Sequence, residues 1–525
     1  MIEKISELIR KVVGEGPKFG VTPSEKPEFG HYATNVAFMV KEDPAVLVEK
    51  LSVVGRELFS KVSATGKFIN FWISQAAFQA ELKNILKQKE KYGASKIGGG
   101  KKVQLEFISA NPTGPLTMAN GRGGFLGDAL GNLLKKTGHD VEKEYYVNDA
   151  GNQVRLLGES ILAIAGKVEP AENHYKGEYV KTLTGVLGKE IQQGMNAADL
   201  GRLAANVLLA SIKQSVKNAG IKFDHWFSEA DSLHKKGELK KTLALLESGG
   251  LVAEHDGAKW LKSNNAEEEK DRVLVKSDGQ PTYFLADLAY HYDKFIKREF
   301  DQSVVIWGAD HHGYIARLKA GVKALGVEPE RLKILIVQLV RLIENGREVK
   351  MSKRAGEFIT LDDLLMEVGK DAARFFFLMH NPETHMDFDM TLAKEKSQKN
   401  PVYYAQYAVV RCVSIFKKAG ILRRLLVASK NPNLALLKSD SEINLVQELV
   451  KYPDLIAQTA KDYQVSRLAR YSLEVARAFN NFYEKERVIV DDKKLMGARL
   501  ALVKATRVVL ENVLGILGVA IPKEM

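Results

Sequence analysis

The sequence predicts a protein of mixed α/β class with three parts: a small α/β domain, a larger domain built around a parallel sheet, and an all-helical domain. Three observations lead to this prediction. A strand pattern over residues 103–108 is followed by a glycine-rich helix start and a second strand over 143–147, as in a βαβ crossover. The 525 residues leave room for three or four domains. From Tyr403 onward only helical periodicity is found.

Composition narrows the class of protein. Hydrophobic residues make up 45% of the chain, as in an ordinary globular protein. The single cysteine, Cys412, excludes an intramolecular disulfide and a multi-cysteine zinc site. The first residues lack the apolar core of a secretory signal, and no uncharged apolar run is long enough to cross a bilayer. We therefore expect a cytoplasmic protein with no membrane partner.

The excess of positive charge is concentrated in the last quarter of the chain. The whole chain carries a formal charge of +12. Residues 396–525 contain 22 Lys and Arg against 12 Asp and Glu, a balance of +10. A basic helical block favours a polyanionic partner such as nucleic acid, although a lysine-rich surface that only confers solubility has the same composition.

Residues 1–95 are predicted to form the N-terminal α/β domain. Helical periodicity alternates there with strand-like runs such as residues 67–73. Glycines within residues 92–100 predict a flexible link. Residues 96–395 would then form the central domain and residues 396–525 the all-helical domain.

The central domain begins with the βαβ unit. Residues 111–115 break the first strand, and a helix follows whose last turn carries Lys135 and Lys136 before the stop at Gly138. Its apolar stripe consists of Phe125, Leu126, Ala129, Leu130, Leu133 and Leu134. Residues of about 165–270 look largely helical and are predicted to interrupt the sheet. Strands resume near Val273 and at residues 304–307 and 334–337.

A basic segment over residues 350–356, KMSKRAG, is the strongest chemical signal in the chain. Asn345 and Gly346 just before it predict a tight hairpin, from which the segment would extend as a mobile loop. Clustered lysines suit the phosphates of a nucleotide, where negative charge builds up in the transition state. A solvated lysine cluster is the alternative.

Other polar segments follow predicted strands, where ligands bind in open α/β sheets. One is the loop after Ile108, and two more are residues 148–151 and 308–314. The adjacent His311 and His312 favour contacts to a base or ribose over a metal site, because neighbouring residues rarely face the same ion.

Tyr283 and Asp287 are four residues apart and share one face of a predicted helix. A carboxylate beside a phenol could hold a cationic group. A capped or salt-bridged structural aspartate is the commoner explanation for a single pair of this kind.

Together these segments resemble the class I aminoacyl-tRNA synthetases, and among them the arginyl-tRNA synthetases. The resemblance covers nearly the whole chain, and its motifs are specific jointly rather than singly. It is carried by residues 29–35, 66–71, 106–116, 145–151, 308–314, 350–356, 371–376 and 400–408.

The resemblance implies a Rossmann-like catalytic domain, a helical anticodon-binding domain and an N-terminal domain that contacts the tRNA elbow. It implies the ATP-dependent ligation of L-arginine to tRNA(Arg) through an arginyl-adenylate, with release of pyrophosphate and AMP. ATP accompanied by Mg²⁺, L-arginine and tRNA(Arg) are the expected partners, and a monomer is the expected state. In this family the first step usually needs bound tRNA.

The resemblance also assigns roles to residues at matching positions. Phosphate and transition-state contacts fall to Lys350, Ser352, Lys353, Thr117 and Asn120. Arginine contacts fall to Glu106, Ser109, Asn111, Asn148, Tyr283 and Asp287, since a planar guanidinium requires more than one acceptor. ATP contacts fall to Thr113, Gly114, Ala119, Gly121, Gly308, Asp310, His312 and Met351. tRNA contacts fall to Tyr403, Tyr407 and Arg411, and no residue is expected to ligate a metal.

One segment departs from the family pattern. After Leu116 the family has a His-x-Gly-His signature, whereas this chain has Thr117, Met118, Ala119 and Asn120. Thr117 and Asn120 keep polar donors, but Ala119 places a methyl group where adenine would lie against bare backbone. An active enzyme is expected because the Lys350 segment and both proposed guanidinium carboxylates are present.

Two alternatives stay open at this point. One is a paralogue that binds tRNA without aminoacylation. The other is a nucleotidyltransferase of the same superfold that acts on a small molecule, a reading that does not explain the basic helical block of residues 396–525.

Overall fold

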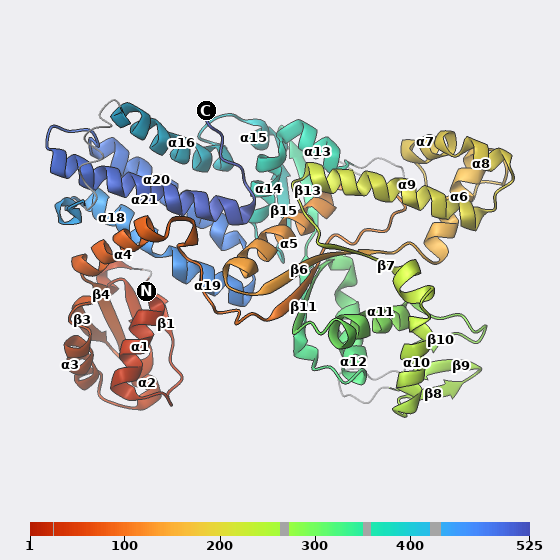
Figure 1. Cartoon of the computed structure of the whole chain (residues 1–525), viewed down its shortest axis with the longest axis horizontal. Helices are drawn as coiled ribbons and strands as arrows, with labels where there is room; N and C mark the ends of the chain where they lie inside the picture. The colour runs from red at the N-terminus through yellow and green to blue at the C-terminus, as the bar shows by residue number, and fades with distance from the viewer. Residues whose placement is uncertain (25, 263–271, 350–358, 421–431) are drawn as a thin grey trace.

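The computed structural model describes residues 1–24, 26–262, 272–349, 359–420 and 432–525, and its α/β class with three parts is as predicted (Figure 1). The N-terminal part contains a four-stranded antiparallel sheet in the order β1-β2-β4-β3. Its elements are α1 (Ile2–Val13), β1 (Val21–Pro23), β2 (Tyr32–Thr34), α2 (Val36–Val40), α3 (Pro44–Val54), β3 (Phe59–Thr65) and β4 (Phe68–Ile73). β4 is an inner strand, and it supplies Ile69, Phe71 and Ile73 to the core.

The central part is built on a five-stranded parallel sheet in the order β12-β11-β5-β6-β7. The strands are β5 (Lys102–Glu106), β6 (Asp140–Val147), β7 (His225–Ser228), β11 (Gln302–Gly308) and β12 (Leu332–Val337). The winding reverses between β5 and β11, so a crevice is expected beyond the carboxyl ends of these two strands. Helix α5 (Met118–Lys136) follows β5 as predicted, and its apolar stripe is buried.

The prediction for residues 165–270 is partly wrong. The four residues of β7 pair in parallel with β6 and form the edge of the central sheet. A strand of this length carries too little alternation to be distinguished from helix by periodicity.

The strand near Val273 exists, but it does not return to the central sheet as predicted. It is β10 (Arg272–Val275), which pairs antiparallel with β9 (Ala258–Leu261). β9 pairs in turn with β8 (Val252–His255), so the three strands form a separate sheet. The remaining elements near this sheet are the π-helix η3 (Ala230–His234), α10 (Glu238–Ser248), α11 (Tyr283–Tyr292), the π-helix η4 (Asp293–Lys297) and α12 (Ile315–Ala324).

The helical insertion forms an arm that extends from the sheet (Figure 1). It contains α6 (Asn152–Ile164), α7 (Glu178–Val186), α8 (Gly188–Gln192) and α9 (Ala197–Asn218). α6 and α9 cross closely at Gly158 and Gly201. A Cβ at Gly158 would lie 1.8 Å from the Ala197 carbonyl oxygen, and one at Gly201 would lie 2.0 Å from the Val154 oxygen. Only glycine permits this backbone approach.

The predicted hairpin is confirmed. β13 (Val340–Glu344) and β14 (Arg347–Glu348) are joined by Asn345 and Gly346, whose φ angles of 49° and 74° are those of a tight hairpin turn. β13 also pairs in parallel with β15 (Met386–Asp389). Helices α13 (Leu361–Val368), α14 (Lys370–Met379) and α15 (Met390–Lys394) surround this small sheet.

The C-terminal part is helical, as predicted. It consists of α16 (Pro401–Gly420), α18 (Asp440–Val450), α19 (Tyr452–Asp462), α20 (Ser466–Lys485) and α21 (Lys493–Leu517), with the short η7 (Leu434–Leu436). Helix α4 (Gln75–Gln88), which follows β4, packs against α18 and α21. None of the described helices is long and apolar enough to span a bilayer.

The link over residues 92–100 is packed at Tyr92, Gly93 and Gly98, so the prediction of a flexible link is wrong for these residues, whereas Gly99 and Gly100 are exposed with open space at their Cβ positions. Tyr92 is buried, and a Cβ at Gly93 would lie 2.5 Å from the Tyr452 ring. A Cβ at Gly98 would meet His139 at the same distance. These glycines give the chain room to pass close to aromatic rings rather than freedom to move.

Arg374 of α14 joins the central and C-terminal parts in the core. Its buried guanidinium pairs with Asp128 of α5. It also donates to the Leu517 carbonyl at the end of α21 (3.1 Å) and to the Ala219 and Gly220 carbonyls beyond α9 (3.2 Å each). One cation therefore binds carbonyls at two helix C-termini, where the helix dipole favours positive charge.

Candidate active site

The loop between β5 and α5 starts with a strained turn. Ile108 and Ser109 have φ angles of 66° and 41°, which are rare for residues with a side chain. The Tyr145 hydroxyl donates to the Ala110 carbonyl (2.7 Å) and supports the turn from β6. Such strain persists only where surrounding contacts hold it, and it is concentrated at functional sites.

Three carboxylates lie close together beyond the carboxyl ends of the strands. Glu106 ends β5, Glu229 follows β7, and Asp287 lies on α11. Their charges act on one another: Glu106 and Glu229 both raise the pKa of Asp287. We refer to these three residues as the acidic pocket.

Glu106 is buried and shared between two groups of the protein. Lys294 of η4 donates to one carboxylate oxygen at 2.7 Å, and the Ser109 hydroxyl donates to the other at 3.2 Å. The Ser109 hydroxyl also accepts the Tyr146 backbone N–H (3.1 Å), so its hydrogen-bonding capacity is largely used. Lys294 was not expected from the sequence, because a lysine in a helical pattern gives no sign that it will be fully buried.

Glu229 is a second residue that the sequence reasoning missed. It is buried, it accepts from the Tyr146 hydroxyl (2.9 Å), and it lies 3.1 Å from His234 Nε2. The Asn148 amide, with its nitrogen facing the carboxylate, donates to Glu229 at 3.1 Å. A glutamate directly after a strand is a usable signal. It was missed because β7 was read as part of a helical insertion.

Asp287 is bonded to a different phenol from the one expected. The Tyr314 hydroxyl donates to its carboxylate, whereas Tyr283 is 56% exposed and points its hydroxyl toward Gly151. Burial raises the pKa of Asp287 to about 7. The Tyr314 hydrogen bond opposes this shift, and the charges of Glu106 and Glu229 add to it.

Asn111 lies on the same loop and bonds to the helical arm. Its amide nitrogen donates to Gln153 Oε1 at the start of α6. The Tyr179 hydroxyl of α7 lies 3.5 Å from the position that a Cβ on Gly114 would take. Thr113 next to it is buried. The arm therefore contacts the loop at two points.

Thr117 and Asn120, which depart from the family pattern, cap the N-terminus of α5. Asn120 Oδ1 accepts from both the backbone N–H and the hydroxyl of Thr117, at 2.9 Å each. Because the backbone N–H can only donate, Oδ1 must face it, and the Asn120 amide nitrogen points away from these bonds. Ala119 is exposed beside them. Gly121 is required by packing, since a Cβ there would lie 2.8 Å from Leu361.

The predicted contacts of Lys350, Met351, Ser352 and Lys353 lie outside the described residues. The residues that follow this segment are bonded to the start of α5. The Met118 N–H donates to the Ile359 carbonyl (3.0 Å), and the Leu361 N–H donates to the Leu116 carbonyl (2.9 Å). Thr117 and Thr360 form an antiparallel bridge.

The segment after β11 borders the crevice from the other side. Gly308, the last residue of β11, is exposed there, and so are Asp310 and His312 on the short 3-10 helix η5 (Ala309–Tyr314). His311 Nε2 lies 3.6 Å from the Asp310 carboxylate. The segment therefore offers polar groups at the switch point of the sheet, and its last residue is the Tyr314 that bonds Asp287.

Comparison with known proteins decides the family. Family models match residues 1–73 (Arginyl tRNA synthetase N terminal domain), 171–389 (tRNA synthetases class I (R), catalytic domain) and 405–525 (DALR anticodon binding domain). The arginine–tRNA ligase of Carboxydothermus hydrogenoformans is 44% identical over 96% of this chain and 93% of that protein. That of Heliobacterium modesticaldum is 42% identical over 98% and 95%. The chain belongs to the arginyl-tRNA synthetase family.

Solved structures agree with this family. An arginyl-tRNA synthetase structure from Campylobacter jejuni is 32% identical, with a TM-score of 0.78 over 86% of this chain and 100% of that chain. The Thermus thermophilus arginyl-tRNA synthetase has a TM-score of 0.82 over the whole of both chains at 21% identity, which supports the fold. The family resemblance expected from the motifs is confirmed.

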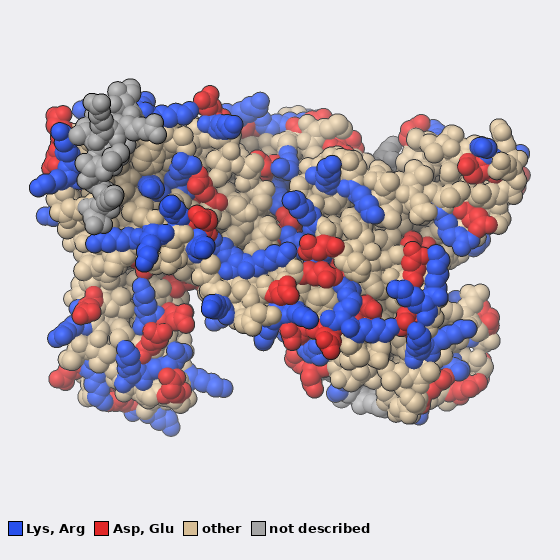
Figure 2. Space-filling model, viewed as in Figure 1, with Lys and Arg blue, Asp and Glu red and all other residues tan. Residues whose placement is uncertain are grey.

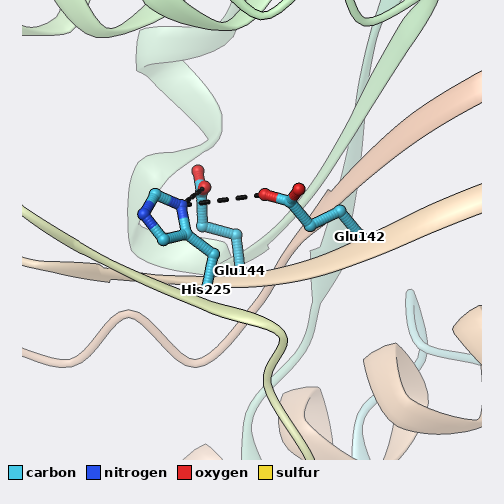
Figure 3. Close-up of side chains that lie close together, drawn as sticks. All are labelled: Glu142, Glu144 and His225. Carbon is cyan, nitrogen blue, oxygen red and sulfur yellow. Dashed lines mark hydrogen bonds and ion pairs between the residues drawn. The ribbon is translucent and has the colours of Figure 1, made fainter.

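A further cluster of this synthetase-family chain consists of Glu142, Glu144 and His225 (Figure 3). Their ligand atoms lie within 4.8 Å of one another, as at a metal site. Arg298 already pairs with both carboxylates, and His225 Nδ1 lies 2.6 Å from Glu144. These contacts lower the pKa of Glu144 to about 2. The guanidinium supplies the positive charge that a metal would bring, so the cluster is structural.

The predicted tRNA contacts of the helical domain form one column of side chains. The rings of Tyr403 and Tyr407 on α16 are stacked at 6.3 Å, and Arg411 lies over the Tyr407 and Tyr483 rings at 4.7 and 4.8 Å. Arg411 also donates to Asn480 of α20 (2.8 Å). Arg411 is thus held by neighbours in the column.

Proposed function

We propose that the protein ligates L-arginine to tRNA(Arg) with ATP, through an arginyl-adenylate. The observation that carries this proposal is the acidic pocket, which lies at the carboxyl edge of the sheet close to the N-terminus of α5. A guanidinium bound in the pocket would leave the carboxylate of the amino acid near the phosphate site. The reaction is inferred from the family, and the preference for arginine is inferred from the acidic pocket.

The acidic pocket suits arginine because its negative charge exceeds the positive charge of Lys294. Lys294 compensates Glu106, which leaves Glu229 and Asp287 with hydroxyl, amide and imidazole partners. Two carboxylates at different angles match the fork of a guanidinium, and an ammonium group cannot bond both in the same way. We therefore propose that arginine contacts Glu229 in addition to Glu106, Asp287 and Tyr283.

The α-amino and carboxylate groups of arginine are assigned to Asn111 and Asn148. Ser109 is assigned a different role from the one first expected. Its hydroxyl is engaged by Glu106 and by the Tyr146 N–H, so it orients Glu106 rather than binding the substrate.

ATP, as its magnesium complex, is assigned to the crevice between α5 and the segment after β11. Backbone N–H groups at the start of α5 favour phosphate, and the Asn120 amide nitrogen, which has no hydrogen-bond partner among the described residues, can donate there. Lys350, Ser352 and Lys353 would stabilise the departing pyrophosphate, beside Thr117. The remaining ATP contacts are Thr113, Gly114, Ala119, Gly121, Gly308, Asp310, His312 and Met351.

The tRNA is assigned to the helical and N-terminal domains. Figure 2 shows Lys and Arg spread over this face of the molecule, with an open notch between the N-terminal and catalytic domains. Tyr403, Tyr407 and Arg411 would contact the anticodon arm. In the N-terminal domain, exposed Phe38 and Phe68 lie beside Lys67, a combination that suits an unstacked nucleotide of the tRNA elbow. A cytoplasmic monomer remains our expectation.

The test is arginine-dependent exchange of labelled pyrophosphate into ATP, with and without tRNA(Arg), followed by transfer of labelled arginine to the tRNA. We expect both steps to occur. Retained tRNA binding without exchange would favour the silent paralogue. Lys353→Ala should lower the exchange turnover by orders of magnitude while leaving tRNA affinity nearly unchanged.

A further inference from the structure

A buried arginine connects α5 to the small sheet β14-β13-β15. Arg122 lies in the second turn of α5, two residues after Asn120, and is only 2% exposed. Its Nη1 donates to the Gln338 and Leu339 carbonyls at 2.8 and 3.4 Å. Its Nη2 donates to the Asn381 and Thr384 carbonyls at 2.8 Å each. One guanidinium therefore binds four main-chain oxygens.

The four carbonyls lie at the beginnings of two adjacent strands. Gln338 and Leu339 lead directly into β13, and Asn381 and Thr384 lead into β15. β13 and β15 are paired in parallel, with Val340 opposite Met386. Arg122 thus holds the first residues of both strands against α5. A planar fork of donors can do this, whereas a point charge cannot.

The charge of Arg122 has no carboxylate partner among the described residues, since its bonds go only to carbonyls. Burial lowers the pKa of Arg122 to about 10, so it stays a cation at neutral pH. Its Nε has no partner among the described residues. Burying a cation that is bound only by carbonyls costs free energy of folding. A contribution to stability therefore does not by itself explain an arginine at this position.

We propose that Arg122 is a positioning residue for ATP activation: it fixes the β13–β14 hairpin against the helix whose N-terminus faces the phosphates. The inference rests on the proposed function. The hairpin leads into the basic segment 350–356, and the residues beyond that segment, Ile359 and Leu361, bond to the start of α5. Arg122 therefore holds the start of the hairpin that precedes the segment, and main-chain bonds hold Ile359 and Leu361 beyond it. A shift of about 1 Å at a catalytic group can cost about a hundredfold in rate.

The variant Arg122→Lys tests the proposal. Lysine keeps the charge but cannot reach four carbonyls at two strand starts. We expect kcat for arginine-dependent pyrophosphate exchange to fall about tenfold to a hundredfold. The KM for arginine should change less than twofold, because Glu106, Glu229 and Asp287 lie on other elements. Backbone amides of β13 and β15 should exchange hydrogen faster in the variant, while those of α11 should not.

Arg499→Lys is the matched control. Arg499 is also a buried arginine, but it lies on α21, where it pairs with Glu442 (2.7 Å) and Glu486 and donates to the Arg487 carbonyl (2.7 Å). We expect this variant to lower the melting temperature and leave kcat per folded molecule unchanged. If Arg122→Lys behaves in the same way, or if it raises the KM for arginine as much as it lowers kcat, the proposal is overturned. Absence of exchange in the wild-type protein would count against the proposed function instead.

Discussion

At the scale of single residues, the affinity of the acidic pocket for a cation depends on the positive charges and hydrogen-bond donors that already surround each carboxylate. Glu106 has Lys294 at 2.7 Å, and Glu229 has two hydrogen-bond donors and His234. Asp287 has only the Tyr314 hydroxyl among its described hydrogen-bond donors. We therefore expect Asp287 to gain most from a bound cation and to lose its proton if a guanidinium binds.

This arrangement predicts a pH-dependent affinity for arginine. With a pKa of about 7, Asp287 is mostly neutral at pH 6 and mostly ionised at pH 8. Since the guanidinium binds the ionised form, the KM for arginine should fall as pH rises, by about tenfold over this range. The measurement is pyrophosphate exchange at several arginine concentrations between pH 6 and pH 8.

Asp287→Asn is the control for this prediction. Its KM for arginine should be raised at every pH and should depend less on pH. The pH dependence that remains in this variant would come from the titration of His234. The pKa of His234 is raised, mainly by its hydrogen bond to Glu229. Identical pH profiles for the variant and the wild type would contradict the role of Asp287.

A second prediction at this scale concerns Asn120. Asn120→Asp keeps an oxygen that accepts from Thr117 and so preserves the helix cap, but it removes the amide N–H groups proposed to bind phosphate and adds negative charge. We expect exchange turnover to fall at least tenfold with little loss of stability. Asn120→Ala should instead also lower the free energy of unfolding by about 1 kcal/mol, because the cap is lost. Unchanged exchange in Asn120→Asp would place the phosphate donors elsewhere.

At the scale of elements, the close crossing of α6 and α9 determines how the helical arm is attached to the site. α6 begins beside the loop between β5 and α5, where Gln153 bonds Asn111, and α9 ends at the carbonyls that Arg374 binds. The arm is thus anchored to the active site at one end and to the core at the other. Its geometry depends on Gly158 and Gly201.

Gly158→Ala should push the two helices apart, because its Cβ would lie 1.8 Å from the Ala197 oxygen. We expect the opening free energy of α6 and α9, measured by hydrogen exchange, to fall by about 2 kcal/mol or more. Gly185→Ala on α7 is the matched control, since nothing lies within 4 Å of its Cβ position. It should be neutral or stabilising by up to about 1 kcal/mol. Equal effects of the two substitutions would refute the close crossing.

At the scale of the whole molecule, the three parts are joined by specific contacts instead of loose linkers. His31 accepts the Ile73 N–H (2.9 Å) and lies 2.9 Å from the Gln447 amide, which links the N-terminal domain to α18. Arg374 links α5 to the end of α21. A tRNA that contacts both outer domains would therefore meet a preassembled surface.

The basic helical block predicts a strong dependence of tRNA binding on salt. Lys485→Glu, at an exposed position of α20 close to Tyr483, should weaken binding of tRNA and reduce the slope of log affinity against log salt by about one to two. The measurement is a titration of tRNA at several salt concentrations. Lys259→Glu, on the β9 strand of the catalytic domain, serves as the control. Equal slopes in Lys485→Glu and the wild type would show that α20 does not face the tRNA.

Sequence alone determined the class of fold, the βαβ unit, the hairpin at Asn345 and the helical end of the chain. These features depend on local rules, namely apolar periodicity, turn residues and caps, which neighbouring residues report directly. It also led us to propose Glu106 and Asp287 as arginine contacts, because their motifs match the family.

Only the tertiary structure decided which groups complete the site. Glu229, Lys294 and Tyr314 come from separate segments, and nothing local marks them as partners of Glu106 or Asp287. The same holds for β7, whose four residues become a strand only by pairing with β6, and for Arg122, whose four carbonyl partners lie more than 200 positions away in the chain. Burial and pairing over long sequence separations are properties of the packed chain, so they cannot be read from the order of its residues.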